Sequence, residues 1–272
     1  MTSSADATSA IGPSALTRTI VLSAAGLFLG LPLFALGAFT VRGGLAGGVT
    51  LIHWRDLFGG NLGAAAQPLW EGVQNSILLA IVTVAVMLAL LVPAMILVRL
   101  HLPRMVRVLE FICLIPLTIP AVALVVGLAP VFSVVARIFG SGSWTLAFAY
   151  VIITLPYAYR SIQANLVAVD VVTLTEAARS LGASWFSTIK DVILPNLRRG
   201  MLAASFISVA VVLGEYAIAS LLSRTNLQTA LVLVSKRDPY VSNIVVLLSL
   251  VLVLILLFAL GRIGTRSRRS RS

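Results

Sequence analysis

Charged side chains are scarce in this sequence. Asp, Glu, Lys and Arg make up only 11% of its 272 residues, against about 25% in a typical soluble domain. Hydrophobic residues make up 59% and come in runs long enough to cross a lipid bilayer. A backbone that spans a bilayer must satisfy its own hydrogen bonds, which such runs do as helices. The sequence therefore excludes an ordinary soluble domain and predicts an all-α, polytopic membrane protein.

Acidic residues are fewer than basic ones. The sequence has nine Asp and Glu and 20 Lys and Arg, which gives a formal net charge of +11. A strongly basic domain can bind nucleic acid. Here the basic residues lie in short runs beside apolar segments, a pattern that orients membrane spans, and no soluble region remains to bind nucleic acid. We expect membrane lipid, and no nucleic acid, around this chain.

Residues for metal, redox and nucleotide chemistry are also few. The single cysteine, Cys113, lies in an apolar run, so we expect a buried hydrophobic side chain and no intrachain disulfide. His53 has no other ligand type near it and is expected to be a solvated loop histidine, not a metal ligand. Neither Lys190 nor Lys236 belongs to a Gly-x-x-x-x-Gly-Lys-Ser/Thr loop. The sequence predicts no metal site, no cofactor and no nucleotide site in this chain.

Six apolar segments approach or exceed the roughly 20 residues that a helix needs to cross the hydrocarbon core. They cover residues 19–41, 73–98, 108–135, 144–162, 201–222 and 241–260. The first is longer than the roughly 7–15 apolar residues of a signal peptide and is expected to be retained. The predicted organisation is a disordered tail at 1–16, a transmembrane domain at 17–262 and a basic tail at 263–272.

The third apolar segment contains Pro116, Pro120 and Pro130. Each proline removes a backbone donor and bends a helix. Such bends are tolerated at membrane depth where neighbouring helices or water satisfy the freed carbonyls. We therefore expect one bent helix over 108–135, in the interior of the bundle.

The distribution of Lys and Arg predicts the orientation of the six spans. An even number of spans puts both termini on one side, together with the loops around 99–107 and 165–200. That side holds fourteen of the 20 basic residues, and the other holds Arg42, Arg55, Arg137, Arg224, Lys236 and Arg237. By the positive-inside rule, both termini and the 165–200 loop are cytoplasmic.

Residues 171–199 form an amphipathic, charged interruption between apolar segments. Apolar residues recur at spacings of three and four over 171–181, which predicts a helix with one apolar face. Thr173 and Glu176 have the spacing of a capping box at the start of that helix.

Gly182 permits a sharp change of direction after this helix, and residues 183–192 can form a second short helix that Pro195 ends. The prediction is two short helices joined at a bend. Spacing alone fits equally well an amphipathic connector along the membrane surface, in which Glu176 only caps a helix.

Three motifs in this loop resemble the EAA loop of the permease subunits of type I ATP-binding-cassette importers. They are Glu176-Ala177-Ala178, then Gly182, and then Ile193-Leu194-Pro195. Many members carry a second proline four residues after the first, where this chain has Arg199. The resemblance covers about residues 73–262. Its softer part looks like the branch that carries polyamines, phosphonates, sulfate and ferric ion, through Asn75-Ser76, residues 114–124 and Leu213-Gly214-Glu215-Tyr216.

The resemblance implies a permease subunit of an importer in a bacterial plasma membrane. One copy encloses half of a pathway for a small polar solute. The implied partners are ATPase subunits that hydrolyse the ATP, a second homologous permease and an external solute-binding protein. The residues implied to couple to the ATPase are Glu176, Ala177, Ala178, Gly182, Leu194 and Pro195.

The candidate pathway residues are Asn75, Pro120, Glu215 and Tyr216. A charge inside a span costs at least about 2.5–3.5 kcal/mol on insertion scales, so Glu215 is expected to face a cavity or a neighbouring helix. If it lines the pathway it attracts cations, which makes a polyamine the leading candidate solute. It could equally bond across to a neighbouring helix, and Asn75 and Tyr216 could serve helix packing.

An ion-coupled secondary transporter is the alternative, with Glu110 and Glu215 as proton relays and no ATPase. The six spans show no convincing internal repeat, which many such transporters possess. Glu110 lies near the end of its span, where we expect it to reach the interface or pair with Arg107. An intramembrane hydrolase is disfavoured, because neither histidine lies in a predicted span and no Gly-x-Ser-x-Gly turn occurs.

Overall fold

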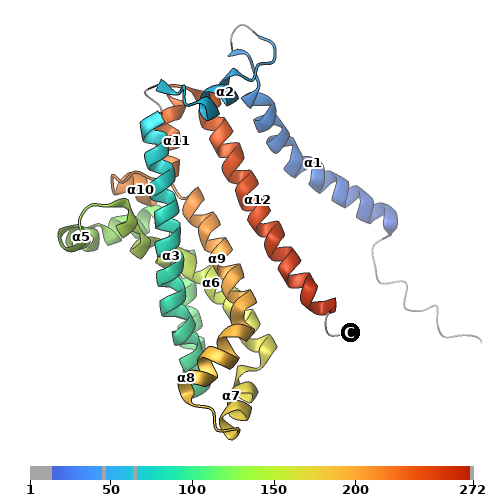
Figure 1. Ribbon diagram of the computed structural model, residues 1–272, viewed down its shortest axis with the longest axis vertical. Coiled ribbons are helices and arrows are strands. Elements are labelled where there is room, and N and C mark those ends of the chain that lie inside the picture. Colours follow the sequence, from blue (N-terminus) through green and yellow to red (C-terminus); the bar gives the residue numbers. More distant parts are fainter. Residues whose placement is uncertain (1–13, 45–46, 64–65, 270–272) are drawn as a thin grey trace, which may run out of the picture.

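A computed structural model describes residues 14–44, 47–63 and 66–269 of the chain (Figure 1). These residues are almost entirely helical, and the only β-type pairing among them is one bridge between Arg42 and Val49. Helix α1 (Ala15–Thr40) begins inside the predicted disordered tail, because the Ser14 hydroxyl caps it and accepts a hydrogen bond from the Thr17 amide at 3.2 Å. Residues 1–13 of that tail lie outside the described residues. The all-α prediction is confirmed.

Five helical stretches among the described residues are long and apolar enough to cross a membrane. They are α1, α3 (Ala66–His101), α5 (Ala121–Phe139), the stretch Trp185–Gly214, and Pro239–Leu256 of α12 (Pro239–Arg269). The fourth predicted span is α6 (Ala147–Val169), which is not among these five because its sequence contains more polar residues, including the buried Tyr150, Thr154 and Tyr159. The chain is a polytopic helical membrane protein.

Helices α3, α6 and α9 (Leu194–Gly214) form the centre of the bundle (Figure 1). Their buried apolar side chains form two clusters along it, and Cys113 lies in the first of these, buried as predicted. Gly200 allows α6 and α9 to approach closely, because a Cβ at this position would lie 2.9 Å from Asn165 Cβ and 3.0 Å from Ser161 O.

The third predicted span is not one bent helix. It consists of α4 (Val106–Leu114), the 3-10 turn Ile115–Thr118, and α5. Ile119 and Pro120 between them are extended, so the chain changes direction there. Two prolines within five residues remove two backbone donors, which breaks the helix instead of bending it. Pro120 and Pro130 are exposed, so the predicted interior position is wrong for this chain taken singly.

Two ends of the bundle matter for function. The α7 end carries α7 (Val171–Ser180) and α8 (Trp185–Ser187), and the opposite α2 end carries α2 (Ile52–Gly59) and α11 (Leu227–Ser235) (Figure 1). Helix α1 contacts α12 and then diverges from the bundle, with nearly all of its side chains exposed.

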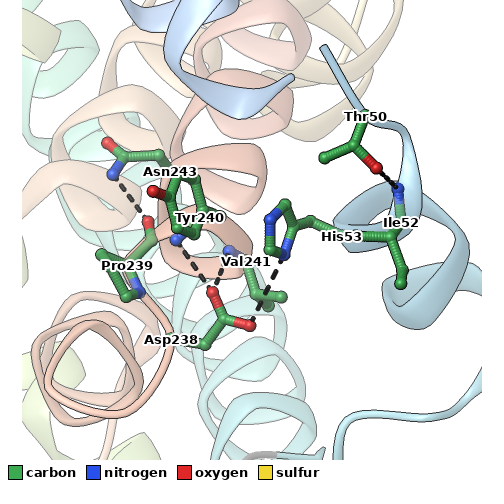
Figure 2. Close-up of polar contacts among 8 residues, drawn as sticks. All are labelled: Thr50, Ile52, His53, Asp238, Pro239, Tyr240, Val241 and Asn243. Carbon is green, nitrogen blue, oxygen red and sulfur yellow. Dashed lines mark hydrogen bonds and ion pairs between the residues drawn. The ribbon is translucent and has the colours of Figure 1, made fainter. Parts of the chain in front are cut away.

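His53 is not the solvated loop residue that the sequence predicts. It lies in α2 with its side chain 18% exposed, stacks on the Tyr240 ring at a centroid distance of 4.3 Å, and places Nδ1 3.9 Å from Asp238 Oδ2 (Figure 2). Asp238 also accepts hydrogen bonds from the Tyr240 and Val241 amides and so caps α12. The stack depends on a residue far along the chain, which local composition does not reveal.

Candidate functional sites

The 165–200 loop forms two helical arms joined at a bend, as predicted. Helix α7 ends at Ser180, and the chain turns through Gly182, whose φ of +85° is in the left-handed region that glycine adopts without strain. The Gly182 amide donates to Arg179 O at 2.9 Å and the Ala183 amide to Ala178 O at 3.1 Å, which closes the end of α7. The Ser184 hydroxyl then caps α8 by accepting from the Ser187 amide at 3.2 Å.

The predicted capping box at the start of α7 is wrong. Asp170, in a left-handed conformation with φ of 47°, is the residue before the helix, and Thr173 is already inside it. The Thr173 hydroxyl donates to Asp170 Oδ2 at 2.7 Å. Because a single residue separates α6 from α7, there is no room for a separate cap at Thr173. The Glu176 side chain is left exposed and is not used as a cap.

The surface around the bend is exposed and partly apolar. Glu176 and Ala177 are exposed, and beside them Leu181 is 89% and Phe186 74% exposed. Contiguous exposed apolar side chains mark surfaces that bind a protein partner or the membrane.

A groove of about 430 Å³ separates α7 from the end of α3. Glu176, Thr175 and Arg179 line one side, and Leu100 and His101 line the other. The His101 ring meets the Trp185 ring edge-on at a centroid distance of 5.0 Å, which ties α3 to α8. Sequence reasoning did not identify His101, which has no motif of its own.

Pro195 does not end the second helical arm. Residues 185–214 are one helical stretch that contains a π-helical turn at Thr188–Ile193, and Pro195 lies in the first turn of α9. A π turn displaces the backbone hydrogen-bonding pattern, and proline is tolerated where its missing donor is not needed. Ile193 is buried and Leu194 packs against the same cluster. Helix α8, which follows the bend, is therefore continuous with α9.

The fifth predicted span is interrupted near its far end. Helix α9 stops at Gly214, Glu215 is extended, and the short helix α10 (Ala217–Leu221) follows. The Glu215 carboxylate accepts a hydrogen bond from the Tyr150 hydroxyl at 2.9 Å, and Oε1 accepts from the Ile218 amide at 3.0 Å. Glu215 thus bonds across to α6 and caps α10, which is the structural one of the two roles left open by the sequence.

Asn226 joins this break to its surroundings. Its Nδ2 donates to Glu215 O at 2.7 Å and to the Tyr150 hydroxyl at 3.1 Å, and its side chain caps α11. Asn75 Nδ2 donates to Thr225 O at 3.0 Å, one residue before Asn226. Asn75 and Glu215 are therefore brought into one region around the buried Asn226.

Two predicted pathway residues lie outside this set of hydrogen bonds. Tyr216 is 43% exposed and lines an open pocket of about 490 Å³ at the α2 end. Pro120 is exposed before α5 and makes no hydrogen bond to Asn75, Glu215 or Tyr216. No group of three or more His, Cys, Asp or Glu side chains among the described residues is arranged to hold a metal ion.

The comparison with known families concerns the part of the chain that contains α4 to α12. Residues 106–268, more than half of the chain, match the family described as "Binding-protein-dependent transport system inner membrane component". The chain belongs to this family. The permease is also similar to the "Probable ABC transporter permease protein y4fN" of Sinorhizobium fredii (strain NBRC 101917 / NGR234), at 31% identity over 185 residues. The alignment covers 65% of this chain and 31% of that protein.

The chain is accordingly a permease of the ABC transporter family. The ion-coupled alternative gains no support. Glu110 is exposed on α4, and Glu215 is held by hydrogen bonds to its neighbours.

Two residues of the helix break escaped sequence reasoning. Asn226 is followed three residues later by Thr229, and the two form a capping box, so a search for cap spacing would have found it. No local sequence pattern identifies Tyr150, because its role depends on a hydrogen bond to Glu215, which lies 65 residues away in the sequence.

Proposed function

We propose that this permease forms half of the pathway of an importer and couples to a separate ATPase through α7, the bend at Gly182 and α8. The observation that carries the proposal is that this segment exposes Glu176, Leu181 and Phe186 at one end of the bundle, while α8 is continuous with α9. An exposed surface that is rigidly joined to a central helix has the form of a docking site and a lever.

A few contacts connect α7 and α8 to the central helices. Movement of α7 passes to α9 because α7 packs against the π turn Thr188–Ile193 of the helical stretch 185–214. It passes to α3 because His101 contacts Trp185 of α8. At the other end of α9, the break at Glu215 separates α9 from α10. Transport of this kind requires two arrangements of packed helices that a partner stabilises to different extents.

The distribution of basic residues supports placing the α7 end and both termini in the cytoplasm. An ATPase there could reach α7, and an external solute-binding protein would meet the α2 end. A second permease is proposed as the partner that covers the exposed apolar side chains of α5, among them Val126 and Ile138. Hydrolysis of ATP is proposed to occur on the ATPase subunits.

A polyamine solute stays a prediction, and the structure weakens the main argument for it. That argument required Glu215 to line the pathway with a free negative charge. The carboxylate is instead half-buried and accepts hydrogen bonds from the Tyr150 hydroxyl and the Ile218 amide. A small polar solute is the class that we propose.

Reconstitution tests the coupling proposal. The permease would be placed in proteoliposomes with its ATPase, second permease and binding protein, and ATP hydrolysis measured with and without loaded binding protein. Stimulation is expected in the wild type and its loss in the Glu176→Ala, Gly182→Pro double variant. Gly26→Ala in α1, where nothing lies within 4 Å of the added methyl group, is the control and should keep the stimulation. Uptake by the chain alone, driven by a proton gradient, would contradict the proposal.

A further inference from the structure

An open pocket of about 490 Å³ at the α2 end is lined by the first turns of α3 and by α10, α11 and the turn between them. The residues that matter here are Glu71 of α3, Tyr216, Arg224 and, at the end of α11, Lys236. Hydroxyl groups of Ser220 and Thr229 add to a polar lining. The pocket lies directly beyond the helix break at Glu215, because Tyr216 is the next residue.

Arg224 is held in place at this pocket. Ser223 before it has a φ of +53°, a conformation that costs energy for a residue other than glycine. The Arg224 amide donates to Ala219 O at 2.8 Å, and its Nη1 donates to Ser141 O in the turn before α6. Its Nε is buried. With Nε buried and one Nη1 hydrogen donated to Ser141 O, the fixed guanidinium keeps its other hydrogens on Nη1 and Nη2 as donors for a ligand.

The charges around the pocket are not balanced. The ion pair between His53 and Asp238 lies outside this pocket, and among the described residues neither Arg224 nor Lys236 has a carboxylate within ion-pair distance. Arg224 bonds to a neutral carbonyl oxygen, and the exposed Lys236 side chain makes no hydrogen bond within the described residues. Two cationic groups therefore face one carboxylate, that of Glu71.

The geometry points to a binding site for an oxyanion group of the transported solute, such as a carboxylate, sulfate or phosphonate, at the outer mouth of the pathway. Arg224 is the anchor, because a planar guanidinium binds oxyanions through two parallel hydrogen bonds. Lys236 adds a second positive charge. This inference rests on the proposed function, and it favours an anionic or dipolar solute over a polyamine, whose amines would meet a net positive lining.

Binding of radiolabelled inorganic sulfate tests the inference without knowledge of the natural solute. The full transporter complex in lipid nanodiscs would be titrated with sulfate, without binding protein and at an ionic strength kept constant with chloride. Sulfate is expected to bind in the millimolar range. Arg224→Gln is expected to weaken binding by at least about tenfold, because it removes two charge-assisted hydrogen bonds. Lys236→Gln is expected to weaken it about threefold, because its exposed charge is screened.

Arg104→Gln is the matched control, since it removes one exposed positive charge near the α7 end. Equal sulfate binding by wild type, Arg224→Gln and Lys236→Gln would overturn the inference, and so would an equal loss in Arg104→Gln. Should Arg224→Gln misfold, Lys236→Gln still decides, because its side chain is exposed. Binding of putrescine that is lost in Glu71→Gln would show a cation site and overturn it too.

Two further outcomes separate this inference from others. If Arg224→Gln weakens docking of the binding protein but leaves sulfate binding unchanged, the pocket is a protein contact and the inference is wrong. A complex whose ATP hydrolysis is coupled but which binds no sulfate refutes the oxyanion site and leaves the proposed function intact. A complex that binds sulfate through Arg224 but never couples to ATP hydrolysis refutes the proposed function instead.

Discussion

The Tyr150 hydroxyl donates a hydrogen bond to Glu215 Oε2 at 2.9 Å and so joins the central helix α6 to the break between α9 and α10. Tyr150 is fully buried, and its oxygen also accepts a hydrogen bond from Asn226. A carboxylate within a membrane span is costly unless it is paired. Here the pairing gives Glu215 a structural role at the point where the fifth span is interrupted.

Tyr150→Phe removes this donor and leaves the carboxylate with one partner fewer. We expect the variant to lose about 1–3 kcal/mol of stability, the usual cost of an unsatisfied buried group. The measurement is the free energy of unfolding in mixed micelles. Glu215→Gln, which keeps an acceptor for Tyr150, should lose less. If Tyr150→Phe is as stable as wild type while Glu215→Gln only changes solute affinity, Glu215 is a pathway residue and the structural assignment is wrong.

Asn226→Ala tests whether Glu215, Tyr150 and Asn226 act as one unit. The variant loses a helix cap, which costs about 0.5–2 kcal/mol, and leaves Glu215 O without its donor. Groups in one network are coupled, so the double variant with Tyr150→Phe should lose less stability than the sum of the two single losses. Strict additivity in this double-mutant cycle would contradict a shared network.

Gly200→Ala tests the close contact of α6 and α9. A Cβ at Gly200 would lie 2.9 Å from Asn165 Cβ, which forces the helices apart. We expect a loss of about 1–3 kcal/mol, as in other overpacked sites, measured as the thermal midpoint in detergent. Gly127→Ala in α5 is the control, because nothing lies within 4 Å of its added methyl group. Equal midpoints for both variants would show that the helices are not in tight contact.

Gly182→Ala tests the bend between α7 and α8. Its φ of +85° disfavours any side chain, and the cost is about 1–2 kcal/mol. Space is not the cause, since nothing lies within 4 Å of the added methyl group. We expect insertion into the membrane to be unchanged and binding-protein stimulation of ATP hydrolysis to fall. A variant with full stimulation would show that the conformation of the bend is not needed for coupling.

The parts of the fold that depend on local pattern could be predicted from the sequence. Apolar length found α1, α3 and α12, and the left-handed preference of glycine found the bend at Gly182. The motif around Glu176 pointed to a family to which the chain belongs.

The parts that depend on distant residues could not be predicted. The break at Glu215 requires Tyr150 and Asn226, and the burial of His53 requires Tyr240. Pro195 was expected to end a helix because proline lacks a backbone donor. That expectation failed because a π turn precedes Pro195, and no sequence pattern indicates such a turn. Pro116 and Pro120 showed that the third span is distorted, but not that it is broken.

Site-directed crosslinking tests most directly whether the α7 end contacts the ATPase. The chain has one cysteine, Cys113, which is buried, so a new surface cysteine can be labelled selectively. Glu176→Cys would be paired with cysteines on the ATPase subunit in the assembled transporter, with Asp56→Cys at the α2 end as the control. We expect a crosslink from position 176, with a yield that changes when ATP binds, and none from position 56. A crosslink from position 56, or none from either position in a complex that hydrolyses ATP, would contradict the account.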